Sequence, residues 1–227
     1  MKSIVWIASW PRSGNTLTRM ILNTQFGIKT RSLHNDTGLG GSKELLDLVG
    51  HNGQGDIHRG GEGTFFIKTH ELHRKNKAIY IVRDGRDAVV SYAKHLENFS
   101  GETFNKELLR RCILGTVGMW ASWGQHVNFW FDRKPMEDTA IIKFESIAGK
   151  PQGPSKIVGA LVDLGLNHAA TFQPKQEIPS FSRLHGLNSK FFRSGQSGQW
   201  QEYFDNELHD LFWSEHGDAM DRAGYEK

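Results

Sequence analysis

The residue types best suited to chemistry in this sequence begin with a short polar turn near its start. An apolar run at residues 4–8 gives way to Ser-Trp-Pro-Arg-Ser-Gly-Asn-Thr at residues 9–16, and apolar residues then recur at helical spacing. This pattern predicts a strand, a turn and a helix in that order. A helix N-terminus attracts anions through its unpaired N–H groups and its dipole, while Gly14 allows close approach of the backbone and Arg12 adds positive charge. The turn is therefore a candidate phosphate-binding site.

His70 and Arg83 are the next candidates, because each comes just after a short apolar run. We expect strands at four places, which are residues 3–9, 64–68, 78–82 and 139–144. Helical stretches long enough for right-handed crossovers separate them, so the predicted fold is α/β with a mainly parallel sheet. Ligands of such sheets lie at the carboxyl ends of the strands. Arg12, His70 and Arg83 are thus expected to meet at one edge of the sheet.

The helix predicted after Arg83 separates a core face from a face that can meet a ligand. Its core stripe consists of apolar side chains, namely Val89, Tyr92, Ala93 and Leu96. Ser91 lies off this stripe and is expected to face the ligand.

The turn at residues 11–17 lacks the first glycine and the lysine of the Walker A pattern, GxxxxGK[ST]. Its sequence, Pro-Arg-Ser-Gly-Asn-Thr-Leu, instead resembles the 5'-phosphosulfate loop of the sulfotransferases, usually PKSGTTW. Taken alone, this match leaves open an ordinary strand-to-helix turn in which Ser13 or Thr16 caps the helix.

Further segments follow in the order that the sulfotransferase family has. Residues 64–70 resemble the VKTH motif, which implies that Lys68 faces the sulfuryl donor and that His70 is the catalytic base. The segment around Arg83 is similar to the family's 3'-phosphate signature, which implies that Arg83 and Ser91, eight residues later, hold one phosphate.

Two more segments extend the resemblance over nearly the whole chain. Residues 191–200 resemble FxRKGxxGDW, the loop that closes on the same 3'-phosphate, and this implies a role for Arg193. Residues 115–127 are similar to the helix that borders the acceptor pocket. The resemblance implies one domain over residues 1–227, with a three-layer α/β/α fold and a P-loop-like turn for the phosphosulfate.

The implied donor is 3'-phosphoadenosine 5'-phosphosulfate (PAPS), with the 3',5'-bisphosphate PAP as product. Its negative charges each need a partner when they leave water, and charge-assisted contacts contribute about 1.5–3 kcal/mol each, so arginines could hold it without a metal. The implied donor-binding residues are Arg12, Ser13, Gly14, Asn15, Thr16, Leu17, Arg83, Ser91, Phe144, Phe181, Arg193, Ser194 and Gly195.

The implied reaction is an in-line attack of an acceptor oxygen on the sulfuryl group, which needs a base and charge stabilisation. His70 is the expected base, because the ordinary pKa of histidine lies near neutrality. Lys68 and Arg12 are expected to stabilise the bridging oxygen as its bond to the sulfur breaks.

The sequence also departs from the family pattern. Arg12 stands where a lysine is commoner, and a planar guanidinium does not simply replace an ammonium. Leu17 and Phe144 replace a frequent Trp and Tyr, so adenine stacking is expected to fall to Phe181, aided by Phe144. Ser194 replaces the usual lysine of the last loop, which leaves one cation fewer for the 3'-phosphate.

Composition fits one compact enzyme with an anionic ligand. The 227 residues carry a formal net charge of +3 and no block of Lys or Arg, which ranks nucleic-acid binding low. The single Cys112 is expected to be a buried thiol in a helix. With a strand beginning by residue 4 and no apolar run of membrane-spanning length, the prediction is a cytoplasmic protein without a membrane segment.

Two other functional classes compete with the sulfotransferase prediction. Asp84, at a strand end, could act as a Walker B carboxylate in a metal-dependent nucleotide kinase or NTPase, although the missing GK[ST] counts against it. A non-enzymatic nucleotide-binding module is weakened by the presence of both Lys68 and His70. The sequence His-Glu-Leu-His at residues 70–73 spaces its histidines three apart after a strand, unlike the helical HExxH zinc motif, so no metal site is expected.

The acceptor is expected to be a small molecule or a saccharide. Residues 34–63, expected over the acceptor side, contain no Phe, Trp or Tyr, which favours a polar, polyhydroxylated acceptor over a simple phenol. We expect residues 35–63 to be irregular apart from a short helix at 42–49. Trp120, Trp123 and Trp130 are expected on one helix, facing the core. Oligomeric state stays open.

Overall fold

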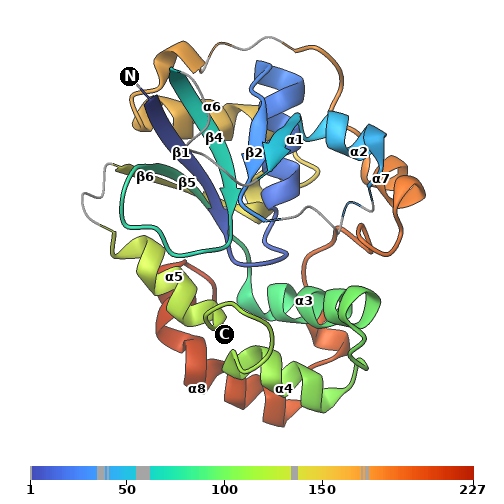
Figure 1. Cartoon of the computed structure of the whole chain (residues 1–227). Helices are drawn as coiled ribbons and strands as arrows, with labels where there is room; N and C mark the ends of the chain where they lie inside the picture. The colour runs from blue at the N-terminus through green and yellow to red at the C-terminus, as the bar shows by residue number, and fades with distance from the viewer. Residues whose placement is uncertain are drawn as a thin grey trace.

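A six-stranded parallel sheet lies at the centre of the computed structural model, which describes residues 2–34, 39, 41–54, 62–133, 138–169, 171 and 174–227 (Figure 1). The strand order is β3-β2-β4-β1-β5-β6. The strands are β1 (Lys2–Ser9), β2 (Thr30–Ser32), β3 (His51–Gln54), β4 (Gly63–Thr69), β5 (Lys77–Val82) and β6 (Thr139–Lys143).

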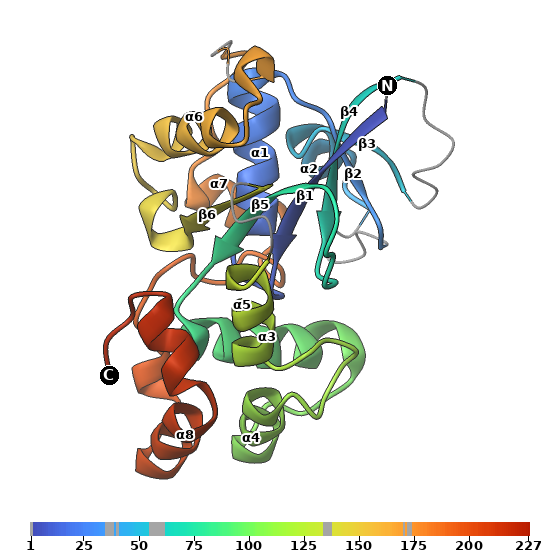
Figure 2. The same cartoon turned by 90° about the vertical axis from the view of Figure 1, so that its left-hand side faces the viewer.

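Helices cover both faces of the sheet and make three layers. They are α1 (Asn15–Phe26), α2 (Lys43–Leu48), α3 (Gly85–Ser100), α4 (Lys106–Leu114), α5 (Trp123–Phe131), α6 (Gly153–Asp163), α7 (Phe181–Leu187) and α8 (Asn206–Arg222), with 3-10 turns η4 (Phe144–Ser146), η5 (Asn167–Ala169) and η6 (Gln199–Glu202). Successive β1 side chains point to opposite faces. Val5 and Ile7 pack with α1 and α6, whereas Trp6 and Ala8 pack with α3, α4, α5 and α8 (Figure 2).

The predicted α/β class, the mainly parallel sheet and the four predicted strands are confirmed, with ends shifted by a residue or so. The helix after Arg83 is α3, and its predicted stripe is buried while Ser91 is only partly covered. Cys112 is buried in α4, as expected. The single-domain organisation stays a prediction.

The expectation of irregular structure over residues 35–63 was wrong for residues 51–54, which form β3, and β2 was missed altogether. Both strands are short and polar, so they lack the apolar signal of a buried strand. They are held by the neighbouring ladder and by the Thr30 hydroxyl, which donates to the Val49 carbonyl at 2.8 Å. Residues 35–38, 40 and 55–61 lie outside the described residues.

Two boundaries also differ from expectation. β6 ends at Lys143, and Phe144 opens the turn η4, because the chain bends where Ile147 donates its N–H to the Phe144 carbonyl. Trp120 precedes α5, since Ser122 caps that helix in a capping box with Gln125. Within the described ranges, no helix combines the length and apolar content needed to cross a bilayer.

Candidate active site

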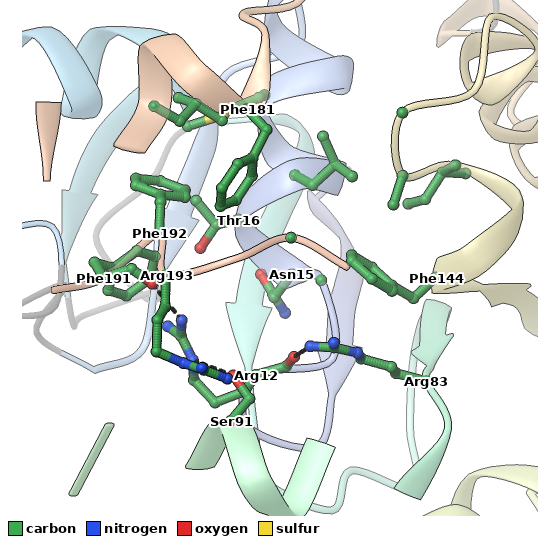
Figure 3. Close-up of a pocket in the computed structure, with 18 of the residues that line it drawn as sticks. Arg12, Asn15, Thr16, Arg83, Ser91, Phe144, Phe181, Phe191, Phe192 and Arg193 are labelled. Atoms are coloured by element: carbon green, nitrogen blue, oxygen red, sulfur yellow. Dashed lines mark hydrogen bonds between the residues drawn. The ribbon is translucent and has the colours of Figure 1, made fainter. Parts of the chain in front are cut away.

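A cavity of about 880 Å³ lies at the carboxyl edge of the sheet, where β1, β4 and β5 end (Figure 3). It collects side chains from the β1–α1 turn, the end of β4, the start of α3 and residues 191–199. The predicted site residues that line it are Arg12, Gly14, Asn15, Thr16, Leu17, Lys68, His70, Arg83, Ser91, Phe144, Phe181, Arg193, Ser194 and Gly195. Motifs far apart in the sequence therefore meet in one cavity.

The β1–α1 turn presents the N-terminus of α1 to this cavity. Gly14 precedes the helix at φ 103°, and no side chain caps the first turn. A Cβ on Gly14 would lie 2.5 Å from the Phe144 ring, so both backbone conformation and space demand glycine here. Asn15 ties the turn to β1 by donating to the Ile7 carbonyl at 2.8 Å. The turn is tied to the strand and leaves helix N–H groups for an anion.

Ser13 is the predicted site residue that does not line the cavity. It is buried, and its backbone N–H donates to the Trp10 carbonyl at 3.2 Å. It contributes this backbone hydrogen bond to the turn and no side chain to the cavity.

Three arginines gather beside the turn. Arg12 donates to the Ser91 hydroxyl at 3.4 Å, and its guanidinium lies 4.2 Å from the centre of the Phe191 ring. Arg83 donates to the Arg12 carbonyl at 3.2 Å (Figure 3). Burial, followed by the charges of Arg83 and Arg193, lowers the pKa of Arg12 to about 10. Cations crowded into a buried place are stabilised by an anion among them.

The closing loop, residues 191–199, brings Arg193 to this cluster. Arg193 donates to the Gln199 amide oxygen at 3.1 Å, and the Ser194 hydroxyl donates to the same oxygen. Gly195, at φ 64°, packs so closely on Phe181 that a Cβ there would lie 2.3 Å from the ring. The loop thus reaches both the arginines and the predicted adenine-stacking side chain.

The geometry of His70 identifies its protonated nitrogen. Its Nδ1 lies 2.7 Å from the Ser9 carbonyl oxygen, and because a carbonyl only accepts, Nδ1 carries the proton. Burial and the charge of Lys68 lower the pKa of His70 well below its ordinary value. The ring is therefore neutral near pH 7, with Nε2 unprotonated and able to take a proton.

Comparison with known proteins identifies the family. Residues 2–223 match the family model described as a sulfotransferase domain. The chain belongs to the sulfotransferase family. Sulfotransferase 1B1 of Canis lupus familiaris is 26% identical over 160 residues, which cover 60% of this chain and 53% of the relative. Human sulfotransferase 4A1 is 24% identical over 227 residues, covering 92% of this chain and 78% of that protein. The matched region of the first relatives is thus about half of their length.

Solved structures of other proteins share the fold. Mouse sulfotransferase SULT7A1 complexed with PAP superposes with a TM-score of 0.66 at 18% identity, covering 96% of this chain and 84% of that one. Retinol dehydratase in complex with androsterone and inactive cofactor PAP gives a TM-score of 0.65 at 16% identity, covering 99% and 82%.

Asp87 is a cavity residue that sequence reasoning missed. Its buried carboxylate accepts the backbone N–H groups of Gly198 at 2.7 Å and of Trp200 at 3.0 Å. The same carboxylate lies 3.9 Å from the Arg83 guanidinium. Asp87 therefore joins the closing loop to α3. Its only sequence signal is an acidic residue one helical turn after Arg83.

Several aromatic side chains that line the cavity were also missed. Trp120 lines the cavity and packs edge-on against His70, with ring centres 5.4 Å apart. Tyr92, Phe191 and Phe192 line the cavity as well. The expectation that Trp120 stands on a helix was wrong, because glycines at positive φ end α4 and loop the chain back toward the cavity, although Trp120 does pack against the core. In the described part of the chain, no group of three or more His, Cys, Asp or Glu could hold a metal ion.

Proposed function

We propose that this sulfotransferase transfers the sulfuryl group of PAPS to a hydroxyl or amine of a small-molecule or saccharide acceptor, with His70 as general base. The observation that carries the proposal is the meeting of Arg12, Arg83 and Arg193 beside an uncapped helix N-terminus, in the same cavity as a neutral His70.

The residues present fit the anionic donor. The turn at Gly14 is a cradle that a Cβ would fill, and the buried Nε of Arg83 has no hydrogen-bond partner in the protein. We assign the 5'-phosphosulfate to residues 12–16 with Lys68, and the 3'-phosphate to Arg83, Ser91 and Arg193. Adenine is assigned to the part of the cavity that Phe144 and Phe181 line (Figure 3).

The chain's own groups supply the proton transfer and the charge stabilisation. The bound donor supplies a sulfuryl group activated by its link to the 5'-phosphate. His70 takes the acceptor proton on Nε2, while Nδ1 stays bonded to Ser9 and holds the ring in place. Lys68 and Arg12 balance the negative charge that develops on the bridging oxygen.

The acceptor side of the cavity combines polar groups with an aromatic wall. Residues 34–63 contain no Phe, Trp or Tyr, but Trp120 and Tyr92 reach the cavity from elsewhere. Flat apolar rings accommodate the face of a sugar as well as a phenol. We infer an acceptor with several hydroxyl groups and one flat apolar face. We propose no nucleic-acid or membrane partner for this reaction. The cytoplasmic location stays a prediction.

Asp84, which supports the kinase alternative, is engaged elsewhere. Its carboxylate accepts the backbone N–H of Arg86 at 2.9 Å and pairs with the Arg86 guanidinium at 2.8 Å. It caps α3 and neutralises an arginine. Nothing observed favours the kinase over the sulfotransferase.

The test is transfer of sulfur label from PAPS to panels of glycans and phenols, read by mass spectrometry. We expect a sulfated product in EDTA, because protein cations balance the charge that magnesium balances in phosphoryl transfer. Activity lost in EDTA and restored by magnesium would contradict the mechanism. Phenol turnover far above that of every glycan would reject the polar acceptor and leave the donor chemistry intact.

A further inference from the structure

Two buried side chains outside the cavity wall, Tyr80 and His126, form a hydrogen-bonded chain that ends on His70. Tyr80 lies in β5 and His126 in α5, and both are 0% exposed. The Tyr80 hydroxyl lies 3.0 Å from Nδ1 of His126, and Nε2 of His126 lies 3.1 Å from the His70 carbonyl oxygen. The chain thus links the middle of the sheet to the main chain of the base.

The direction of each hydrogen bond follows from the chemistry of the groups. Burial lowers the pKa of His126 to about 3, so near neutral pH its ring carries one proton. A carbonyl oxygen can only accept, so that proton is on Nε2. Nδ1 must then accept, and the Tyr80 hydroxyl donates to it. Burial raises the pKa of Tyr80 well above its ordinary value, so the hydroxyl keeps its proton.

Two hydrogen bonds hold His70 in place just beyond the end of β4, where strand pairing no longer holds the main chain. The ladder between β1 and β4 ends at the pair Ala8–Thr69, so His70 is the first residue beyond it. Its ring is held by the Ser9 carbonyl, and its own carbonyl is held by His126. Main chain and ring are therefore both anchored.

Packing alone does not require these polar groups. Tyr80 stacks on Trp130 with ring centres 5.4 Å apart, and an apolar ring could fill the same space. Burying an imidazole and a phenol carries a desolvation cost that their hydrogen bonds offset. Unlike an apolar pair, Tyr80 and His126 also provide an N–H that donates to the His70 carbonyl.

We propose that His126, oriented by Tyr80, is a positioning residue that holds the catalytic base His70 in place. This rests on the proposed function of His70. A displacement of about 1 Å at a catalytic group can cost roughly 100-fold in rate, so the loss of one anchor is expected to show in turnover.

Two substitutions at one position separate positioning from packing. The amide of His126→Gln can occupy the place of Nε2 and still donate to the His70 carbonyl. The amide of His126→Asn reaches only the place of Nδ1, so it keeps Tyr80 and loses His70. We expect His126→Asn to lower kcat by roughly 10- to 100-fold with PAP affinity unchanged, whereas His126→Gln keeps most of the wild-type kcat.

A matched control lies in α8. His216 is another buried histidine, and its Nε2 lies 2.9 Å from the Ile113 carbonyl, but it does not line the cavity or contact His70. His216→Asn should lower the melting temperature as His126→Asn does while keeping kcat. Equal kcat losses in His126→Gln and His126→Asn, or a similar loss in His216→Asn, would overturn the positioning role.

A readout without turnover separates this proposal from the function on which it rests. Long-range proton–nitrogen NMR of the wild-type protein should show the proton of His126 on Nε2 and that of His70 on Nδ1. A proton on Nδ1 of His126 would overturn the proposal even in an active enzyme. A wild-type protein with the expected tautomers but no sulfuryl transfer would instead refute the proposed function, and the positioning of a base with it.

Discussion

His70 combines two properties that a general base needs, a fixed ring and a free proton-accepting nitrogen. The Ser9 carbonyl fixes the tautomer, and burial with Lys68 keeps the ring neutral. Because Nδ1 already carries its proton, protonation of Nε2 leaves the hydrogen bond from Nδ1 to the Ser9 carbonyl intact. Proton uptake at Nε2 therefore needs no rotation of the side chain.

Replacing His70 by alanine should abolish turnover and spare nucleotide binding. A general base acts on the acceptor proton, so kcat should fall by roughly 10²- to 10⁴-fold while PAP affinity changes little. His73→Ala is the control, because His73 stacks on Trp6 at 3.9 Å and does not line the cavity. Substantial turnover in His70→Ala, or a parallel loss of PAP binding, would show that the base is misassigned.

Asp87→Asn should weaken the contacts that keep the closing loop and Arg83 in place. The amide keeps the size of the side chain but loses the charge that accepts two N–H groups and faces Arg83. Hydrogen bonds to a charged group contribute about 1.5–3 kcal/mol, so the Kd for PAP should rise by about tenfold or more. Calorimetry checks this, with the exposed Asp163→Asn as control. An unchanged PAP affinity would remove Asp87 from the site.

At the scale of elements, the β1–α1 turn is the part whose geometry was most accessible to sequence reasoning. Strand, glycine turn and helix are local patterns, and each is present as predicted. β2 and β3 were inaccessible because their pairing depends on neighbours that are distant in sequence. Trp120 was misplaced for a related reason: tertiary contact, not helical spacing, brings it to His70.

Gly14→Ala should damage this turn beyond the ordinary cost of strain. Positive φ alone costs a non-glycine residue about 1–3 kcal/mol, and here the added Cβ would also meet the Phe144 ring at 2.5 Å. Gly101→Ala is the matched control, because Gly101 has φ 73° with no atom near its Cβ position. We expect both variants to melt earlier and only Gly14→Ala to lose PAP binding. Equal PAP affinity in the two variants would contradict the assignment of the Gly14 turn to phosphate binding.

At the scale of the molecule, the sequence predicts that the site lies at the edge where the strands end. It does not predict the contacts by which the surrounding helices and the closing loop complete the site. Parallel topology alone predicts that Arg12, His70 and Arg83 converge. The contact of Asp87 with Gly198, more than a hundred residues away, has no local signature. The hydrogen bond from His126 to His70 has no local signature either. Both contacts depend on how α3, α5 and the closing loop pack.

Buried histidines should make the whole protein sensitive to mild acid. Burial lowers the pKa of His95 to about 4 and of His126 to about 3, and it lowers that of His70 as well. The unfolded chain binds protons below about pH 6.5 while the folded chain does not, so stability falls as pH falls. The melting temperature should therefore drop between about pH 7 and about pH 5, and by less in His126→Gln. A flat profile would contradict these lowered pKa values.

The most direct test of the central claim needs no knowledge of the acceptor. PAP, 5'-AMP and ATP are titrated into the protein by calorimetry without divalent metal. Because Arg83, Ser91 and Arg193 are assigned to the 3'-phosphate, PAP should bind at least about 100-fold more tightly than 5'-AMP. ATP should bind more weakly than PAP. Tighter binding of ATP than of PAP would contradict the account and favour a nucleotide kinase.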